Sequence, residues 1–167
     1  GLHACLAAGI AMTNEIPQLQ AQGELLSVDL SILKRWQIDY DELLQQVQHG
    51  SPSVQLWDCR SEDEYLGERM AARRAGHIPT ALHYDWCQLF CRERQLKLYP
   101  LAEIQQQLQQ RGFDLSQPVV VYCQSHHRSS LAYVVARLLH WSVRAYDGAW
   151  SEWGNESHSP IHSGAEP

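Results

Sequence analysis

A cysteine followed by an unbroken polar run is the part of this chain best suited to chemistry. The stretch VVVYCQSHHRSS covers residues 119–130 and places Cys123 directly after an apolar, β-branched run. The seven residues after the cysteine are all polar and include two histidines and an arginine. A lone cysteine is most often a small buried packing residue. A turn within the core has no need for such a polar segment, so the sequence favours a reactive thiol at Cys123.

The neighbouring segments indicate how this cysteine is positioned. Residues 119–122 have the continuous apolar pattern of a strand that is covered on both faces. Apolar residues then recur at 131, 134, 135, 138 and 139, which is the spacing of one helical face. Residues 123–130 are therefore predicted to form a strand-to-helix turn. The free backbone N–H groups of the helix start, together with Arg128, would form an anion pocket that stabilises a thiolate.

The remainder of the chain alternates between strand and helix patterns. Short strands are predicted at residues 54–57, 82–84 and 143–146, and helices at residues 39–47, 100–110 and 149–153. Residues 61–64 have the pattern of a capped start of a further short helix. This alternation predicts an α/β domain with a mostly parallel central sheet. Functional groups gather at the carboxyl ends of such strands, where Asp58 and Cys123 are both expected.

The composition narrows the range of partners and compartments. The 13 basic and 19 acidic side chains give a net charge of −6, which disfavours nucleic acid and anionic membranes as partners. No apolar run approaches the roughly 20 residues that a membrane helix needs. The five cysteines are odd in number and include no C-x-x-C pair. We therefore expect reduced thiols and a cytoplasmic location.

Four motifs in order carry a resemblance to a known family. They are DCR with EYLG (residues 58–60 and 64–67), GHIPTA (76–81), CQSHHRS (123–129) and YDGAWSEW (146–153). The third resembles the active-site loop of the rhodanese sulfurtransferases, and most closely that of the catalytic C-terminal half of two-domain bacterial thiosulfate sulfurtransferases. The motifs extend over roughly residues 40–160. The resemblance implies a rhodanese-like α/β fold with a mostly parallel central sheet and helices on both faces.

The resemblance also implies a double-displacement reaction. Cys123 would attack the outer sulfur of thiosulfate, become a persulfide, and pass that sulfur to cyanide or a thiol, which includes the thiol of an acceptor protein. The loop residues would surround the donor and the persulfide; they are Gln124, Ser125, His126, His127, Arg128 and Ser129. This chemistry needs neither a metal nor an organic cofactor. Two alternatives remain open: 3-mercaptopyruvate as the donor, and a sulfur-relay or binding module that a desulfurase loads.

Loop length and several substitutions distinguish this chain from its relatives. Arg128 completes a C-x4-R loop, whereas phosphatases of the same fold use C-x5-R to enclose a phosphate. Ser125 and Glu64 stand where the mammalian-type enzymes carry basic residues. Arg128 then remains to bind the donor anion, with the arginines at 69, 73 and 74 as further candidates. Thr80 and His126 stand where the family often has glycine.

The residues around the loop are interpreted as support. Asp58 and Arg60 are predicted to form an ion pair that braces the site, and Trp150 and Trp153 to pack beside the loop as a wall. His126 and His127 are interpreted as solvated loop residues rather than proton shuttles, because a low-pKa thiolate needs no base. The spacing of Cys87 and Cys91 predicts that they share a helix face as packing residues, and Cys59 is expected to be buried.

The first thirty residues call for a separate interpretation. The segment GLHACLAAG (1–9) resembles the end of a rhodanese repeat, where a short helix closes the fold. We therefore expect residues 1–30 to be the remnant of a preceding repeat with its linker, and residues 31–167 to be the catalytic domain. The alternative is a vector-derived or accidental helix.

Overall fold

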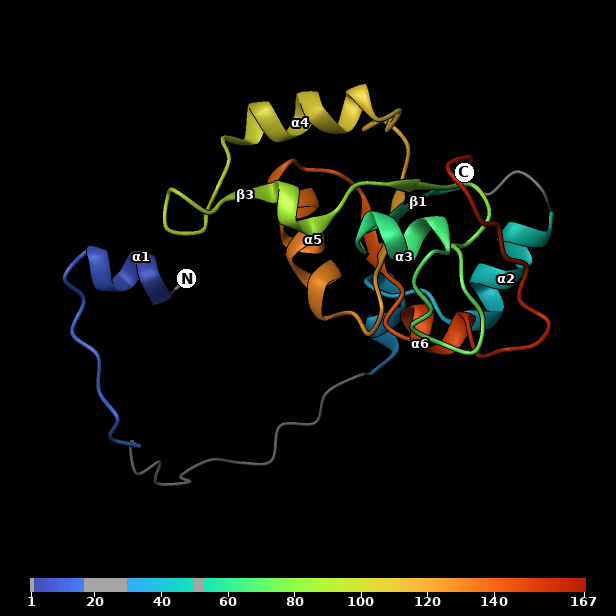
Figure 1. Cartoon of the computed structure of the whole chain (residues 1–167), viewed down its shortest axis with the longest axis horizontal. Helices are drawn as coiled ribbons and strands as arrows, with labels where there is room; N and C mark the ends of the chain where they lie inside the picture. Colours follow the sequence, from blue (N-terminus) through green and yellow to red (C-terminus); the bar gives the residue numbers. More distant parts are fainter. Residues whose placement is uncertain (1, 17–29, 50–52) are drawn as a thin grey trace.

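The computed structural model describes residues 2–16, 30–49 and 53–167 (Figure 1). The α-helices are α1 (Leu2–Ala7), α2 (Tyr40–Gln48), α3 (Glu62–Leu66), α4 (Leu101–Gln110), α5 (His127–Leu138) and α6 (Ala149–Trp153). Two 3-10 helices are η1 (Leu30–Arg35) and η2 (Trp86–Leu89). The strands are β1 (Gln55–Asp58), β2 (Ala81–His83), β3 (Phe90–Cys91), β4 (Lys97–Leu98), β5 (Val119–Tyr122) and β6 (Val143–Ala145).

A four-stranded sheet in the order β2-β1-β5-β6 forms the centre of the fold. All three neighbouring pairs in it are parallel, which confirms the predicted α/β class. Every residue of β5 is buried, in agreement with its unbroken apolar pattern. Parallel strands need crossover connections, and the intervening helices supply them. The carboxyl ends of β1 and β5 therefore meet at one edge of the sheet.

Helices cover both faces of the sheet, as expected. On one face, Ile104 and Leu108 of α4 and Val135 of α5 pack in a cluster with Trp57 and Val121 of the sheet. The opposite face is covered by α2 and α6, whose buried side chains form a second cluster with the other sheet residues. Figure 1 shows α4 and α6 on opposite sides of β1. The alternation of side chains along each strand divides the apolar residues between these two cores.

The start of α5 differs from the sequence prediction. The helix begins at His127, four residues before Leu131, so residues 127–130 form its first turn rather than part of the loop. The apolar spacing missed this turn because only Ser129 is buried among these polar residues. Periodicity detects the helical turns that contact the core, and the first turn of α5 contacts the loop instead.

The sequence did not predict η2, β3 or β4, and one prediction about cysteines was wrong. Residues 86–98 form η2 followed by the antiparallel β3–β4 hairpin. The 3-10 helix ends at Leu89, so Cys87 lies in η2 whereas Cys91 lies in β3 opposite Lys97. The two cysteines do not share a helix face. Cys59 is fully buried, as expected.

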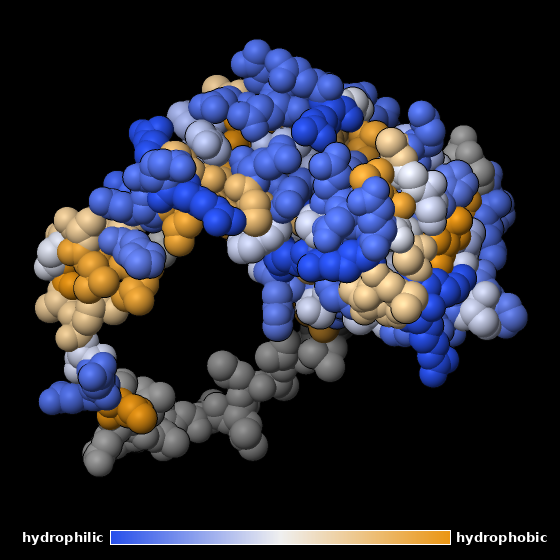
Figure 2. Space-filling view, in the orientation of Figure 1, coloured by the Kyte–Doolittle hydropathy of each residue, from blue (hydrophilic) through white to orange (hydrophobic). Residues whose placement is uncertain are grey.

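The amino-terminal segment contributes a short exposed helix. The short helix expected within residues 1–9 is present as Leu2–Ala7, and none of the residues of α1 is buried. Leu2 and Leu6 are more than half exposed, and Figure 2 shows apolar surface at this helix. Much of the predicted linker, residues 17–29, lies outside the described residues. The origin of residues 1–30 in a preceding repeat stays a prediction. Among the described helices, none has the length and hydropathy to cross a membrane.

Candidate active site

Cys123 lies at the carboxyl edge of the sheet, directly after β5. Its side chain is almost completely buried, and its carbonyl oxygen accepts a hydrogen bond from the Trp150 N–H at 2.9 Å. The register that pairs Asp58 with Tyr122 continues past the strand ends, because the Cys59 N–H donates to the Tyr122 carbonyl at 2.9 Å. Cys59 and Cys123 belong to the same buried cluster, so the two cysteines lie close together.

Cys59 is a poor nucleophile in this position. Burial raises the pKa of the Cys59 thiol well above its usual value, and the charges of Asp58 and Cys123 raise it further. The nearby positive charge of Arg128 opposes this shift without reversing it. A thiol with a raised pKa remains protonated at neutral pH, and only the thiolate attacks sulfur. Of these two neighbouring cysteines, Cys123 is the one that the loop surrounds.

The loop after Cys123 is held by α6 on one side and leads into α5 on the other. The Gln124 carbonyl accepts from the Ser151 N–H at 2.9 Å, and its side-chain amide donates to the Ala71 carbonyl at 2.9 Å. His126 has a left-handed backbone with φ of 62°, which reverses the chain at the N-cap of α5. The first backbone N–H groups of a helix have no intrahelical acceptor. They therefore lie at the end of the loop that Cys123 begins.

Arg128 is fixed by a carboxylate that the sequence did not reveal as its partner. Its two terminal nitrogens donate to Glu64 at 2.6 and 2.9 Å, and the Glu64 side chain is 1% exposed. Glu64 also forms a capping box with Ser61 at the start of α3. Burial alone would raise the pKa of Glu64, but the hydrogen bonds from Arg128 and Ser61 outweigh it and hold that pKa at about 2. The charge of Arg128 is therefore balanced within the protein.

This pairing changes the expectation about the donor anion. Arg128 and Arg69 were both candidates to bind it, yet Arg69 also contacts Glu64, at 2.8 Å. Arg74 donates to the backbone carbonyls of Ser159 at 2.8 Å and Trp153 at 2.9 Å. Three of the four candidate arginines are thus engaged in holding the fold. The S-x-x-E pattern at residues 61–64 indicated the helix cap, but it did not indicate that the same carboxylate faces Arg128.

The predicted ion pair between Asp58 and Arg60 is confirmed. The two side chains are fully buried and their closest atoms lie 2.6 Å apart. Burial would lower the pKa of Arg60, but the Asp58 carboxylate outweighs it and raises that pKa. The guanidinium also donates to the Gly76 carbonyl at 2.7 Å and lies 4.3 Å from the centre of the Trp150 ring. This pair ties the end of β1 to α6.

The two tryptophans of α6 have different surroundings. The backbone N–H of Trp150 donates to the Cys123 carbonyl at the start of the loop, and the Trp150 ring covers Arg60. Trp153 packs against the rings of Tyr40 and Tyr146 at 5.6 and 6.2 Å, in the core that α2 shares. The prediction of a wall beside the loop therefore applies to Trp150. Trp153 instead anchors α6 to the fold.

The two histidines also differ. The exposed position of His127 agrees with the interpretation as a solvated residue, whereas His126 is half-buried. The His126 Nδ1 lies 2.8 Å from the hydroxyl of Ser129, which is completely buried. Burial lowers the pKa of His126; Asp147 opposes this shift and His127 adds to it. His126 is thus part of the loop structure and is only partly solvated.

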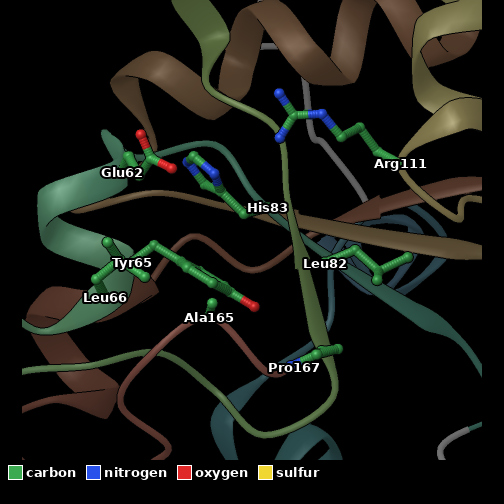
Figure 3. A pocket seen from close by; sticks show the side chains of 8 residues that line it. All are labelled: Glu62, Tyr65, Leu66, Leu82, His83, Arg111, Ala165 and Pro167. Carbon is green, nitrogen blue, oxygen red and sulfur yellow. The ribbon is translucent and has the colours of Figure 1, made fainter.

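α3 and β2 border a cavity of about 350 Å³, shown in Figure 3. Tyr65, His83 and Arg111 line it together with residues 165 and 167 of the C-terminal segment. None of the predicted loop or supporting residues lines it. The cavity therefore lies outside the site that surrounds Cys123.

Comparisons with known proteins agree with this geometry. The Rhodanese-like domain matches residues 39–156. A thiosulfate sulfurtransferase of Azotobacter vinelandii is 35% identical over 162 residues, which cover 96% of this chain and 57% of that protein. One from Pseudomonas aeruginosa is 36% identical and covers 67% of this chain and 41% of that protein. The sulfur carrier protein TtuD of Thermus thermophilus is 32% identical, over 95% of this chain and 58% of that protein.

Solved structures show the same fold. An anaerobic ergothioneine biosynthesis enzyme from Chlorobium limicola, in complex with trimethyl histidine, superposes with a TM-score of 0.67. It is 27% identical, over 78% of this chain and 32% of that chain. An EanB variant in complex with ergothioneine gives a TM-score of 0.83 at 24% identity, over 98% of this chain and 40% of that chain. The chain spans about half the length of the curated relatives named above. It belongs to the rhodanese-like domain family.

Proposed function

We propose that this chain is a sulfurtransferase that moves sulfane sulfur from thiosulfate to cyanide or a thiol through a persulfide on Cys123. The observation that carries the proposal is the position of Cys123, buried at the sheet edge beneath a loop that leads into the first turn of α5. Similarity to two thiosulfate sulfurtransferases supports the choice of donor.

The proposed reaction has two steps. In the first, the Cys123 thiolate attacks the outer sulfur of thiosulfate, a new S–S bond forms, and sulfite leaves with the electron pair of the broken S–S bond. In the second, cyanide attacks the terminal sulfur of the persulfide, thiocyanate leaves, and the thiolate of Cys123 is restored. The free thiolate and the persulfide are both anions at Cys123, so the same backbone N–H donors can stabilise both forms.

The residues around the sulfur have distinct proposed roles. Arg128 is paired with Glu64 and also interacts with Cys123, since both raise its pKa, so it stabilises the anion together with the backbone N–H groups of the loop and α5. The pairing with Glu64 also fixes Arg128 in the first turn of α5. Gln124, Ser125 and His126 form the loop, and His127 and Ser129 belong to the first turn of α5 that follows it. Asp58, Arg60 and Trp150 support it from β1 and α6.

The decisive experiment combines activity with intact mass. We expect Cys123→Ser to abolish thiocyanate formation, and thiosulfate to increase the mass of the wild-type protein by one sulfur atom that cyanide then removes. Cys59→Ser is the matched control, because it removes the adjacent buried thiol, and it should still accept the sulfur. Sulfur transfer that persists in Cys123→Ser would refute the proposal.

A second candidate function is a sulfur relay loaded by a desulfurase protein. Similarity to the sulfur carrier protein TtuD favours it. The same mass measurement separates the two functions. A relay would stay unmodified by thiosulfate and gain one sulfur atom from a cysteine desulfurase with cysteine. If 3-mercaptopyruvate is the donor, its kcat/KM will exceed that of thiosulfate.

A further inference from the structure

A basic cavity lies at the end of the sheet opposite Cys123. Its volume is about 440 Å³, and Arg35, Trp36, Arg137 and Arg144 are among the residues that line it. Val119 and Val143, the first residues of β5 and β6, form part of its wall. Cys123 follows the last residue of β5, so the length of that strand, about 13 Å, separates the two places. The basic cavity is not part of the candidate active site.

The charge of this cavity stands out in a protein with a net charge of −6. Three arginines line it, and no carboxylate is among its described lining residues. Arg144 donates to Glu42 at 2.8 Å, which balances one positive charge. Arg35 and Arg137 form no ion pair with a carboxylate of the described part of the chain. Among the described residues, two positive charges at the cavity therefore have no carboxylate partner.

Trp36 holds these two arginines in place. The guanidinium carbon of Arg35 lies 5.0 Å from the centre of the Trp36 ring, and that of Arg137 lies 4.8 Å from it. The Trp36 backbone is itself anchored, since its carbonyl accepts from the Ala145 N–H at 2.8 Å at the edge of β6. Stacking on an aromatic ring restricts a guanidinium and orients its N–H groups. Both guanidinium groups are thus held against one ring before any ligand arrives.

A purely structural role does not explain this arrangement. Arg35 and Arg137 lie in the last turns of η1 and α5, where a positive charge interacts favourably with the helix dipole. That interaction accounts for each arginine separately. It does not account for two guanidinium groups on one ring that lines a cavity. Like charges held against the same ring repel each other, and a bound anion would reduce this repulsion.

We infer that the basic cavity binds a small molecule through a phosphate group or a similar divalent oxyanion. The N–H groups of two arginines match the oxygens of such an anion, and the two charges balance. Ser53 and Ser142 add hydroxyl groups to the wall, and Val54, Val119 and Val143 add apolar surface. The volume exceeds that of an inorganic ion and falls in the range of small-molecule sites, so an organic portion also fits.

The test is a titration of the 167-residue chain with inorganic phosphate and with phenyl phosphate. Calorimetry measures the affinity, and NMR of the tryptophan indole N–H groups monitors the site. Trp36→Phe assigns the indole signal of Trp36. We expect both probes to shift that signal, and phenyl phosphate to bind more tightly because the ring occupies the apolar wall. Equal affinities would identify the free oxyanion as the ligand.

Matched variants locate the binding. Arg35→Ala and Arg137→Ala should each weaken phosphate binding by about tenfold, the loss of one charge-assisted partner. Arg94→Ala removes the same charge from an exposed position elsewhere and should leave the affinity unchanged. Arg137→Lys keeps the charge without the planar group and should give an intermediate affinity, which also controls for misfolding of the alanine variants. The inference is overturned if neither probe binds, if the Trp36 signal does not move, or if Arg94→Ala has the same effect as Arg137→Ala.

Discussion

At the scale of single residues, Glu64 determines how the loop after Cys123 is built. The buried Glu64 carboxylate caps α3, accepts hydrogen bonds from both terminal nitrogens of Arg128, and contacts Arg69. A buried ion pair is expensive to break from one side, because the remaining charge loses its partner without regaining full hydration. The loop therefore depends on a residue that is distant from it in the sequence.

Replacing Glu64 with glutamine tests this dependence. We expect Glu64→Gln to lower the free energy of unfolding at pH 7 by on the order of 3 kcal/mol, since it leaves Arg128 without its partner. The pKa of Glu64 in the folded protein, about 2, lies below its ordinary value. The stabilisation is therefore fully present above about pH 4.5, and it is lost as the pH falls toward 2. Urea unfolding at a series of pH values measures the difference from wild type.

The control for that experiment is Glu62→Gln. Glu62 lies in the same first turn of α3 but is exposed. An equal loss of stability in both variants would contradict the role of Glu64.

His126 permits a second residue-scale prediction. Burial lowers its pKa below that of an unfolded histidine, so acid protonates the unfolded chain first. The wild-type protein should consequently lose stability as the pH falls through the ordinary histidine range. His126→Asn should lose less stability, because asparagine tolerates the left-handed backbone, offers a partner to Ser129 and does not titrate. Thermal melting between pH 7 and pH 5 compares the two, and His127→Asn should behave like wild type.

At the scale of elements, two tight turns contain residues that do not suit them. Thr80 before β2 and His126 before α5 have φ of 70° and 62°, values that favour glycine. The family often has glycine at both positions. A β-branched residue is especially disfavoured in this region. At these two positions, Thr80 and His126 thus hold the backbone in a conformation that glycine would adopt without strain.

Relief of this strain should stabilise the protein. We expect Thr80→Gly to raise the free energy of unfolding by about 1 kcal/mol, after allowance for the extra freedom of glycine in the unfolded chain. Thr80 is exposed, so no packing is lost with its side chain. Thr80→Ala removes the same side chain without relieving the backbone, and its unfolding curve should show no such gain. A destabilised Thr80→Gly would argue against strain at this turn.

Elements with a clear residue pattern were predictable from the sequence. Those without one were missed, for physical reasons. The apolar run of β5 and the acidic start of α2 at Asp39 identified both elements, and Asp39 does accept the capping hydrogen bond of Glu42 at 2.9 Å. The β3–β4 hairpin was missed because its turn contains Gln95 and Leu96 at positive φ, in place of the glycine or asparagine that signals such a turn. In the site, the ion pair between Asp58 and Arg60 was predictable because the two residues lie close together in the sequence. The ion pair between Glu64 and Arg128 was not predictable, because only the folded chain brings these residues together.

At the scale of the whole molecule, stability should be distributed unevenly. The strands β1 and β5 lie in the middle of the sheet with a core on either face. Their amides should exchange with solvent only when the entire domain unfolds. None of the residues of α1 is buried, so its amides should exchange by local opening. Hydrogen–deuterium exchange with mass spectrometry measures both. Equal protection of α1 and β5 would contradict this distribution.

The internal balance between Arg128 and Glu64 has a consequence for how the proposed donor approaches. Thiosulfate is a dianion, and with Arg128 paired to Glu64 it meets the field of a protein whose net charge is −6. Electrostatic repulsion then slows their encounter, and added salt screens it. For thiosulfate, kcat/KM should therefore increase with ionic strength, the opposite of the trend for an enzyme that attracts its substrate by charge.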